Sequence, residues 1–257
     1  MIKIASWNVN SLKVRLEQVL DWLKESQTDI LALQETKCED AMFPKEVFEE
    51  AGFEVEFRGQ KTYNGVAWIS RFPMQDAEDA FIDFSDEQKR ILATTVKDIR
   101  LINFYIPNGQ SVGSNKYEYK LAWLDSMQAF INQQMSKYPN VVVVGDFNIA
   151  PQDIDVHDPK QWEGQVLVSP AERMAFEDLL RQGLVDGIRL HNPQDNLYSW
   201  WDYRAAAFRR QMGLRIDHIL LSRDLSNKCV ASGVDVKPRT HDRPSDHTPV
   251  WVTLNLA

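Results

Sequence analysis

Short apolar runs rich in valine and isoleucine recur along the chain and have the length of β-strands. Each run is bounded by turn residues or by charge, which is how strands end. Several are apolar at consecutive positions, so we expect both of their faces to be buried. The expected strands cover residues 2–9, 29–33, 65–69, 91–96, 101–106, 141–144, 216–221 and 250–254.

Three segments between these runs have the apolar spacing of amphipathic helices. The first covers residues 12–23 and the second residues 116–137. The third begins at Ser169, an N-cap hydroxyl that is followed three residues later by the capping-box carboxylate of Glu172. Many strands with helices between them predict an α/β fold of packed layers. Because no Pro-, Gly- or Ser-rich linker divides the chain, we expect residues 1–257 to form a single domain.

The composition is that of an ordinary globular protein, with 44% hydrophobic and 26% charged residues. The formal net charge of −8 argues against a protein that coats nucleic acid through bulk charge, although local basic patches remain possible. The two cysteines, Cys38 and Cys229, lie far apart without metal-site spacing, so we expect reduced thiols. No stretch has the length of a membrane span or a secretory signal, so we expect a soluble, cytoplasmic protein.

Polar side chains stand where five of the expected strands meet loops. Ligands of open α/β sheets bind where strands end and loops begin. One such residue alone is most simply a turn residue or a helix cap, but five boundaries in one chain favour a functional site. The residues are Asn8, Glu35, Tyr105, Asn108, Asp146, Asn148, Asp246 and His247.

Asp217 lies inside an expected strand, on the same face as Ile219 and Leu221. A carboxylate at such a position must be paired, because an unpaired buried charge is prohibitive. It either forms a structural ion pair with an arginine or orients a catalytic histidine, as carboxylates do in triads. The candidate histidine is His247, since His218, inside the strand, fits a structural role better.

The candidate residues offer the hard oxygen ligands that suit Mg²⁺ or Mn²⁺. Mg²⁺ usually takes few protein carboxylates and completes its shell with water and substrate phosphate, so this ligand type indicates phosphate-ester chemistry. The oxygens belong to the carboxylates of Glu35, Asp146 and Asp246 and to the amides of Asn8 and Asn148.

Seven motifs follow one another along essentially the whole chain: Ser-Trp-Asn-Val-Asn, Leu-Gln-Glu-Thr-Lys, Tyr-Ile-Pro-Asn-Gly, Gly-Asp-Phe-Asn-Ile-Ala, Tyr-Ser-Trp-Trp-Asp-Tyr-Arg, Gly-Leu-Arg-Ile-Asp-His-Ile-Leu and Arg-Pro-Ser-Asp-His-Thr-Pro-Val. In this order they resemble the exonuclease III family of apurinic/apyrimidinic (AP) endonucleases, of the bacterial exodeoxyribonuclease III type. The wider endonuclease/exonuclease/phosphatase superfamily includes DNase I-like nucleases and inositol-phosphate phosphatases. The resemblance implies a four-layer α/β sandwich, in which two facing mixed β-sheets are flanked by helices.

The resemblance also implies an activity. It is that of a Mg²⁺-dependent DNA-repair phosphodiesterase, with Mn²⁺ as a substitute metal. Such an enzyme cuts the backbone 5′ to abasic sites and removes nucleotides or blocking groups from 3′ ends of duplex DNA; which activity dominates is left open. Glu35 would be the principal metal ligand, and the metal neighbourhood would be completed by Asn8, Asp146, Asn148, Asp246 and His247.

Catalytic roles follow from the same resemblance. Asp146 would activate or orient the attacking water, and Asn148 would hold that water or stabilise the transition state. His247, oriented by Asp217, would contact the scissile phosphate. Carboxylates suit the water's proton, and cationic or neutral donors suit the charge that builds on phosphorus. Phosphate oxygens would be bound by Tyr105 and Asn108.

A basic segment beside aromatic residues predicts the DNA contacts. Residues 204–215 contain four arginines and no acid, they follow Trp200, Trp201 and Tyr203, and residues 237–243 are also basic. A solvated loop is the alternative, but adjacent aromatics favour stacking or wedging against nucleic acid. By resemblance, Trp200 with Leu214 and Ile216 would wall a pocket for a flipped-out abasic sugar. The expected DNA-binding residues are Asn108, Trp200, Arg204, Leu214, Arg90 and Lys120.

Two other functions stay open on the sequence alone. The same fold could act on a phosphoinositide or another non-DNA phosphate ester, although the segment from Trp200 to Arg215 argues against this. A non-catalytic DNA-binding module would leave several carboxylates unexplained beside a phosphate path. We therefore expect a monomer that acts on nucleoid DNA with abasic sites or 3′ ends. Its negative charge gathers in residues 39–56 and 76–87, which we expect to face away from DNA.

Overall fold

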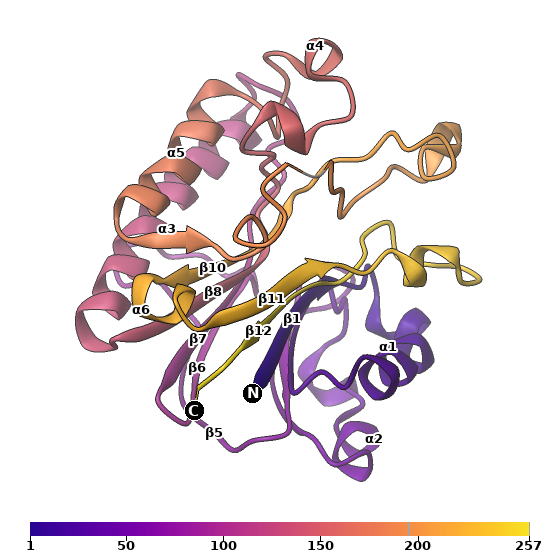
Figure 1. The fold of residues 1–257 in the computed structure, drawn as a ribbon, viewed down its shortest axis with the longest axis vertical. Helices are drawn as coiled ribbons and strands as arrows, with labels where there is room; N and C mark the ends of the chain where they lie inside the picture. Colours follow the sequence, from indigo (N-terminus) through magenta and orange to yellow (C-terminus); the bar gives the residue numbers. More distant parts are fainter. Residues whose placement is uncertain (195, 257) are drawn as a thin grey trace.

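The first of two six-stranded sheets contains both ends of the described chain. The computed structural model describes residues 1–194 and 196–256. In spatial order the sheet consists of β11 (Cys229–Val234), β12 (Val250–Leu254), β1 (Ile2–Asn8), β2 (Ile30–Gln34), β4 (Val66–Ser70) and β3 (Glu54–Arg58). Helices α1 (Leu12–Ser26) and α2 (Lys45–Glu50) cover its outer face (Figure 1).

The second sheet has a helical layer on its own outer face. Its spatial order is β5 (Met74–Glu78), β6 (Ile91–Val96), β7 (Ile99–Tyr105), β8 (Asn140–Asp146), β10 (Asp217–Ser222) and β9 (Leu184–Asp186). The covering helices are α3 (Asn115–Lys137) and α5 (Pro170–Arg181). The connections contain α4 (Pro159–Trp162), α6 (Arg223–Ser226) and the 3₁₀ turns η1 (Asp40–Met42), η2 (Asp153–Asp155), η3 (Arg204–Ala206) and η4 (Lys237–Thr240).

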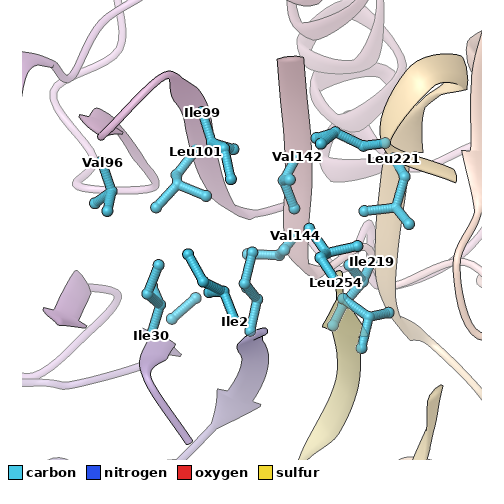
Figure 2. Packing of buried hydrophobic residues seen from close by; sticks show 14 of the residues in the cluster. Ile2, Ile30, Val96, Ile99, Leu101, Val142, Val144, Ile219, Leu221 and Leu254 are labelled. Atoms are coloured by element: carbon cyan, nitrogen blue, oxygen red, sulfur yellow. The ribbon is translucent and has the colours of Figure 1, made fainter. Parts of the chain in front are cut away.

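The two sheets face each other and form a core between them (Figure 2). Strand β8 is buried on both faces, which explains why its four valines are consecutive. Val142 and Val144 pack between the sheets, whereas Val141 and Val143 pack under α3 and α5. Each such side chain contributes about 1.5–3 kcal/mol when it is fully buried. Helices, sheet, sheet and helices make four layers, which confirms the sandwich of two mixed sheets that the family resemblance implied.

All eight expected strands and all three expected helices are present. The helix predicted to begin at Ser169 has the predicted capping box, in which the Ser169 hydroxyl accepts from the Glu172 backbone and Glu172 bonds the Ser169 backbone. Across the described residues, none of the helices combines the length and apolarity needed to span a membrane. The elements that the sequence pattern missed are the strands β3, β5, β9 and β11, the helix α2, and the short turns of helix.

The strand directions bring the candidate residues to one edge of both sheets. β1 runs parallel to β2, and β7 runs parallel to β8, so these strands all end at that edge. β10 is antiparallel to β8 and β12 is antiparallel to β1, so both begin there. The edge therefore gathers Asn8, Glu35, Tyr105, Asp146, Asp217 and His247.

Candidate active site

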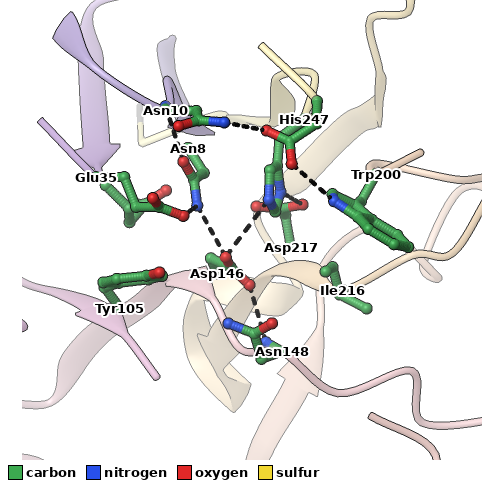
Figure 3. Close-up of polar contacts among 12 residues, drawn as sticks. Asn8, Asn10, Glu35, Tyr105, Asp146, Asn148, Trp200, Ile216, Asp217 and His247 are labelled. Atoms are coloured by element: carbon green, nitrogen blue, oxygen red, sulfur yellow. Dashed lines mark hydrogen bonds and ion pairs between the residues drawn. The ribbon is translucent and has the colours of Figure 1, made fainter. Parts of the chain in front are cut away.

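Asn8 connects two carboxylates that come from different sheets. Its side-chain amide donates to Oε1 of Glu35 over 2.8 Å and to Oδ2 of Asp146 over 2.9 Å. Glu35 follows β2 with a backbone φ of 50°, a conformation that is uncommon outside glycine and that occurs at functional sites. The side chains of Glu35, Asp146 and His247 point toward one another in Figure 3.

This arrangement fits a divalent cation. One ligand atom each from Glu35, Asp146 and His247 lies within 4.8 Å of the others. Two carboxylates held this close repel each other, and oxygen ligands of this kind suit Mg²⁺ or Mn²⁺. Asp246 lines the same cavity as these three residues, but its oxygens already have hydrogen-bond donors. They accept from the Asn10 amide (2.9 Å) and from the Trp200 indole (3.1 Å).

Asp217 is paired with His247 rather than with an arginine. Nδ1 of His247 lies 2.9 Å from Oδ2 of Asp217, and the Ser199 hydroxyl donates to the same oxygen over 2.6 Å. Both side chains are buried, and Asp217 lies on the face of β10 that meets the other sheet. Of the two alternatives that the sequence left open, the structure therefore has the histidine-orienting one.

Charge and burial shift the pKa values of this group. Burial alone would lower the pKa of His247, but the charges of Asp217 and Asp146 outweigh it and raise the pKa to about 10. Burial raises the pKa of Asp146 to about 7, against the opposing charge of His247, whose Nε2 lies 3.6 Å away. His247 is thus a cation whose Nδ1–H faces Asp217 and whose Nε2–H faces the centre of the site.

Asn148 and Asn108 form a second polar pair beside Asp146. The Asn148 backbone N–H donates to Oδ1 of Asp146 (2.9 Å), and its side-chain amide donates to the Ile106 carbonyl (3.0 Å). The Asn108 amide donates to Oδ1 of Asn148 (3.1 Å). Both asparagine side chains are therefore held in place before any substrate arrives.

Tyr105 completes the polar side of the site. Burial and the charges of Glu35 and Asp146 raise the pKa of its phenol well above the usual value, so the hydroxyl stays a neutral donor. The guanidinium of Arg90 lies 4.7 Å from the centre of the Tyr105 ring and donates to the Tyr105 carbonyl (3.1 Å). Arg90, which we expected to bind DNA, thus supports Tyr105 in this structure.

A cavity of about 340 Å³ opens at these residues. One side is polar and the other is apolar, and Trp200 and Ile216 line it as the sequence predicted. The exposed side chain of Arg204 also lines the cavity and pairs with Asp202. Sequence reasoning missed a second apolar wall. The wall consists of Trp162, at the end of α4, and of Val166 and Leu167 in the loop that follows. The sequence shows no strand or helix pattern there, and the only signal is the apolar run from Val166 to Val168.

Three residues that the sequence placed at the DNA-binding surface are buried in the structure. Leu214 does not line the cavity, because it is buried behind Trp200 with its backbone bridged to that residue. Lys120 does not reach the surface, since its ammonium is buried against Glu172. Arg215 leaves the basic segment for the interior, where it pairs with Asp155 (2.7 Å) and Asp186 (2.8 Å). A DNA contact by Lys120 or a pocket wall by Leu214 is therefore wrong for this structure.

Comparison with known proteins agrees with this geometry. Residues 5–247 match the model of the Endonuclease/Exonuclease/phosphatase family. The chain is 34% identical to exodeoxyribonuclease III of Haemophilus influenzae, an alignment that covers 97% of this chain and 98% of that protein. Among solved structures, it resembles the 3′ phosphatase NExo from Neisseria bound to a product DNA hairpin, with 41% identity, a TM-score of 0.98 and coverage of 99% and 100%.

A third relative comes from an archaeon. An AP endonuclease from Archaeoglobus fulgidus has 37% identity and a TM-score of 0.96, and the match covers both chains completely. The similarity thus extends over whole chains and is not confined to the residues of the site. The chain therefore belongs to the endonuclease/exonuclease/phosphatase family, and within it to the exodeoxyribonuclease III-type nucleases.

Proposed function

We propose that this nuclease hydrolyses the DNA backbone 5′ to abasic sites and removes nucleotides or blocking groups from 3′ ends of duplex DNA, with Mg²⁺ as cofactor and Mn²⁺ as a substitute. The observation that carries the proposal is the grouping of Glu35, Asp146 and His247 beside a cavity with an aromatic wall. Further support comes from relatives that are named as an exodeoxyribonuclease, a 3′ phosphatase and an AP endonuclease.

The metal would be held mainly by Glu35 and Asp146, within a neighbourhood that also contains Asn8, Asn148, Asp246 and His247. When bound, it would supply positive charge against the negative charge that builds on the phosphorus. Without such a cation, the close carboxylates would repel both one another and an incoming phosphate.

The protein's own groups would handle the protons and the phosphate oxygens. Asp146 would accept the proton of the attacking water, and the fixed amide of Asn148 would orient that water. His247 would donate its Nε2–H to a phosphate oxygen, because its Nδ1–H is already committed to Asp217. The neutral hydroxyl of Tyr105 and the amide of Asn108 would bind the remaining phosphate oxygens.

The cavity would recognise the damaged nucleotide. Trp200, Ile216 and Leu167 form an apolar surface next to the phosphate-binding groups. A deoxyribose that lacks its base has an apolar face and leaves the duplex at lower cost than a paired nucleotide, since no pairing or stacking must be broken. We propose that the protein acts as a monomer, because every residue of the proposed site lies within one chain. We also propose that it acts in the cytoplasm, on nucleoid DNA.

The test is a set of matched duplexes that carry one abasic analogue, a 3′ phosphate or a recessed 3′ end. Each is incubated in Mg²⁺ and in EDTA, and cleavage rates are compared with phosphate release from a phosphoinositide. We expect nicking of the abasic duplex in Mg²⁺ only, and slower or no lipid hydrolysis. An abasic duplex that stays intact in both conditions, or faster hydrolysis of the lipid, would contradict the proposal.

A further inference from the structure

A buried ion pair lies directly behind the phosphate-binding loops. Lys120 on α3 and Glu172 on α5 are both completely buried, and they contact each other across the two helices. We propose that this pair is a positioning device, which holds the loops of Asn108 and Asn148 in the geometry that the reaction needs. The inference rests on the function proposed above, because it assigns the pair an effect on the rate of that reaction.

Lys120 joins the backbones of the two asparagine loops. Its Nζ donates to the carbonyl of Asn148 (2.7 Å), to the carbonyl of Asn108 (3.2 Å) and to Glu172. An ammonium group has three N–H donors, so all of them are used. The side chains of Asn108 and Asn148 bond each other on the other side of the loops. Lys120 thus fixes from behind the two residues that face the substrate.

Glu172 connects the same ammonium to a third loop. Its Oε1 accepts from the Leu167 backbone N–H (3.0 Å), and its Oε2 accepts from the N–H (3.1 Å) and hydroxyl (2.6 Å) of Ser169. Leu167 has a φ of 77°, which is strained for a leucine, and its side chain lines the cavity. The ion pair therefore holds both the polar and the apolar sides of the cavity.

Energetics also favour a positioning role over a purely stabilising one. Moving two charges out of water is costly, and well-packed neutral residues of similar volume often stabilise a protein equally well or better. Here the hydrogen bonds that the pair makes with other residues go to loops of the site or to the start of α5. These hydrogen bonds fix the positions of the loops relative to one another. Misplacement of reacting groups by about 1 Å can cost about 100-fold in rate.

The direct test replaces the charged pair by a neutral one. Lys120→Met alone would leave the Glu172 carboxylate buried without its partner and could fail to fold. The double variant Lys120→Met/Glu172→Gln removes both charges and keeps a capping-box side chain at position 172. We expect the variant to stay folded but to lose some thermal stability, because the carbonyls of Asn108 and Asn148 lose their donor. Its kcat on the abasic duplex should fall about 10- to 100-fold with little change in KM.

A matched control lies at the other end of α3. Arg100 is buried and pairs with Glu78 (2.6 Å) and with Gln134 near the end of that helix. The variant Arg100→Met/Glu78→Gln should change thermal stability but leave kcat unaffected. In an Asn108→Ala background, the rate loss caused by Lys120→Met/Glu172→Gln should become smaller, because contacts that act through the same residue are not additive.

Three results would overturn the inference while leaving the proposed function intact: full kcat in the Lys120→Met/Glu172→Gln variant, an equal loss in the Arg100 control, or an undiminished loss in the Asn108→Ala background. Absence of cleavage by the wild-type protein would instead overturn the proposed function, and the inference with it. A fall in kcat that accompanies loss of the folded state in the double variant would also count against positioning.

Discussion

Asp217 sets the protonation and the orientation of His247. It is fully buried, and its Oδ2 accepts from both His247 and Ser199. The pair fixes which imidazole nitrogen faces the site, since Nδ1 is used by Asp217 and only Nε2 can reach a substrate. An imidazole without this partner would lose both its charge and its preferred tautomer.

Asp217→Asn should therefore lower kcat strongly while leaving the fold intact. The amide has nearly the same shape but cannot stabilise the imidazolium, and comparable changes in triads cost about 10⁴-fold. We expect a loss of at least about 100-fold, measured by single-turnover cleavage of the abasic duplex. The control is Ser199→Ala, which removes one hydrogen bond to Asp217 but keeps its charge, and should cost much less. Equal losses in the two variants would contradict the orienting role.

The candidate residues could be chosen from the sequence, whereas the residues packed around them could not. Asn8 and Asp146 stand at the ends of buried strands and His247 stands shortly before one, and strand ends meet at a sheet edge. The sequence shows Lys120 as a basic residue able to contact phosphate, but not the three acceptors that hold its ammonium in the interior. Leu167 could not be predicted as a cavity residue, because its segment has neither the apolar spacing of a strand nor that of a helix.

Strand β10 connects the site to the loop that follows Asn148, through the side chain of His218. Nε2 of His218 lies 2.8 Å from the Ile149 carbonyl, and Nδ1 lies 3.0 Å from the Arg215 guanidinium. This geometry requires a neutral imidazole that donates from Nε2 and accepts at Nδ1. Burial, reinforced by the charge of Arg215, lowers the pKa of His218 to about 4. The segment that follows Asn148 is thus held by a histidine that must not be protonated.

Stability should consequently fall with acid in a window set by His218. Its pKa is near 6.5 when unfolded and about 4 when folded, so the unfolded state binds the proton more tightly. The contribution is complete above about pH 6.5 and is lost as the pH falls toward 4, amounting to about 3 kcal/mol. Urea unfolding at several pH values should give a shallower acid dependence for His218→Gln than for the wild type. Identical pH slopes would contradict this role.

The elements that the sequence missed are those with little apolar surface. β3 and β5 are the outer strands of their sheets and contain Glu54, Glu56, Asp76 and Glu78. Charged residues on edge strands oppose pairing with other molecules, which is useful to the protein but removes the apolar signal of a strand. Central strands such as β8, buried on both faces, were predictable from four consecutive valines.

Strands from the beginning and the end of the sequence pair with each other in the first sheet. β12, near the C-terminus, pairs with β1 at the N-terminus, from Ile2 against Leu254 to Ser6 against Val250. The core between the sheets takes residues from both ends and from the middle of the sequence. We therefore propose that residues 1–257 are one domain, since neither sheet could bury its inner face alone.

Charge is unevenly distributed over this molecule. The acidic segments include the edge strands β3 and β5, whereas Arg204, Arg209 and Arg210 are exposed in the loop that follows Trp200. Figure 1 shows this loop projecting beyond the sheets beside the segment that contains η4. An excess of acid is compatible with a DNA substrate when bases gather where phosphate passes.

Reversing charge in this loop should weaken DNA binding in a salt-dependent way. We expect Arg209→Glu/Arg210→Glu to reduce duplex affinity at least about tenfold at low salt, and to reduce the slope of log affinity against log salt. The control, Lys24→Glu/Lys228→Glu, makes the same change in net charge at exposed positions near the opposite edge of the sheets. Similar losses in both variants would indicate that only net charge matters.

We propose that one group of residues at the sheet edge performs phosphodiester hydrolysis, with Asp146 as the group that handles the water. It is tested most directly by Asp146→Asn, assayed in Mg²⁺ for both cleavage and binding of a duplex with one abasic analogue. We expect cleavage to fall at least about 1,000-fold while DNA affinity changes only a few-fold, because the amide removes the base but not the DNA contacts. Loss of binding in proportion to loss of cleavage would contradict it.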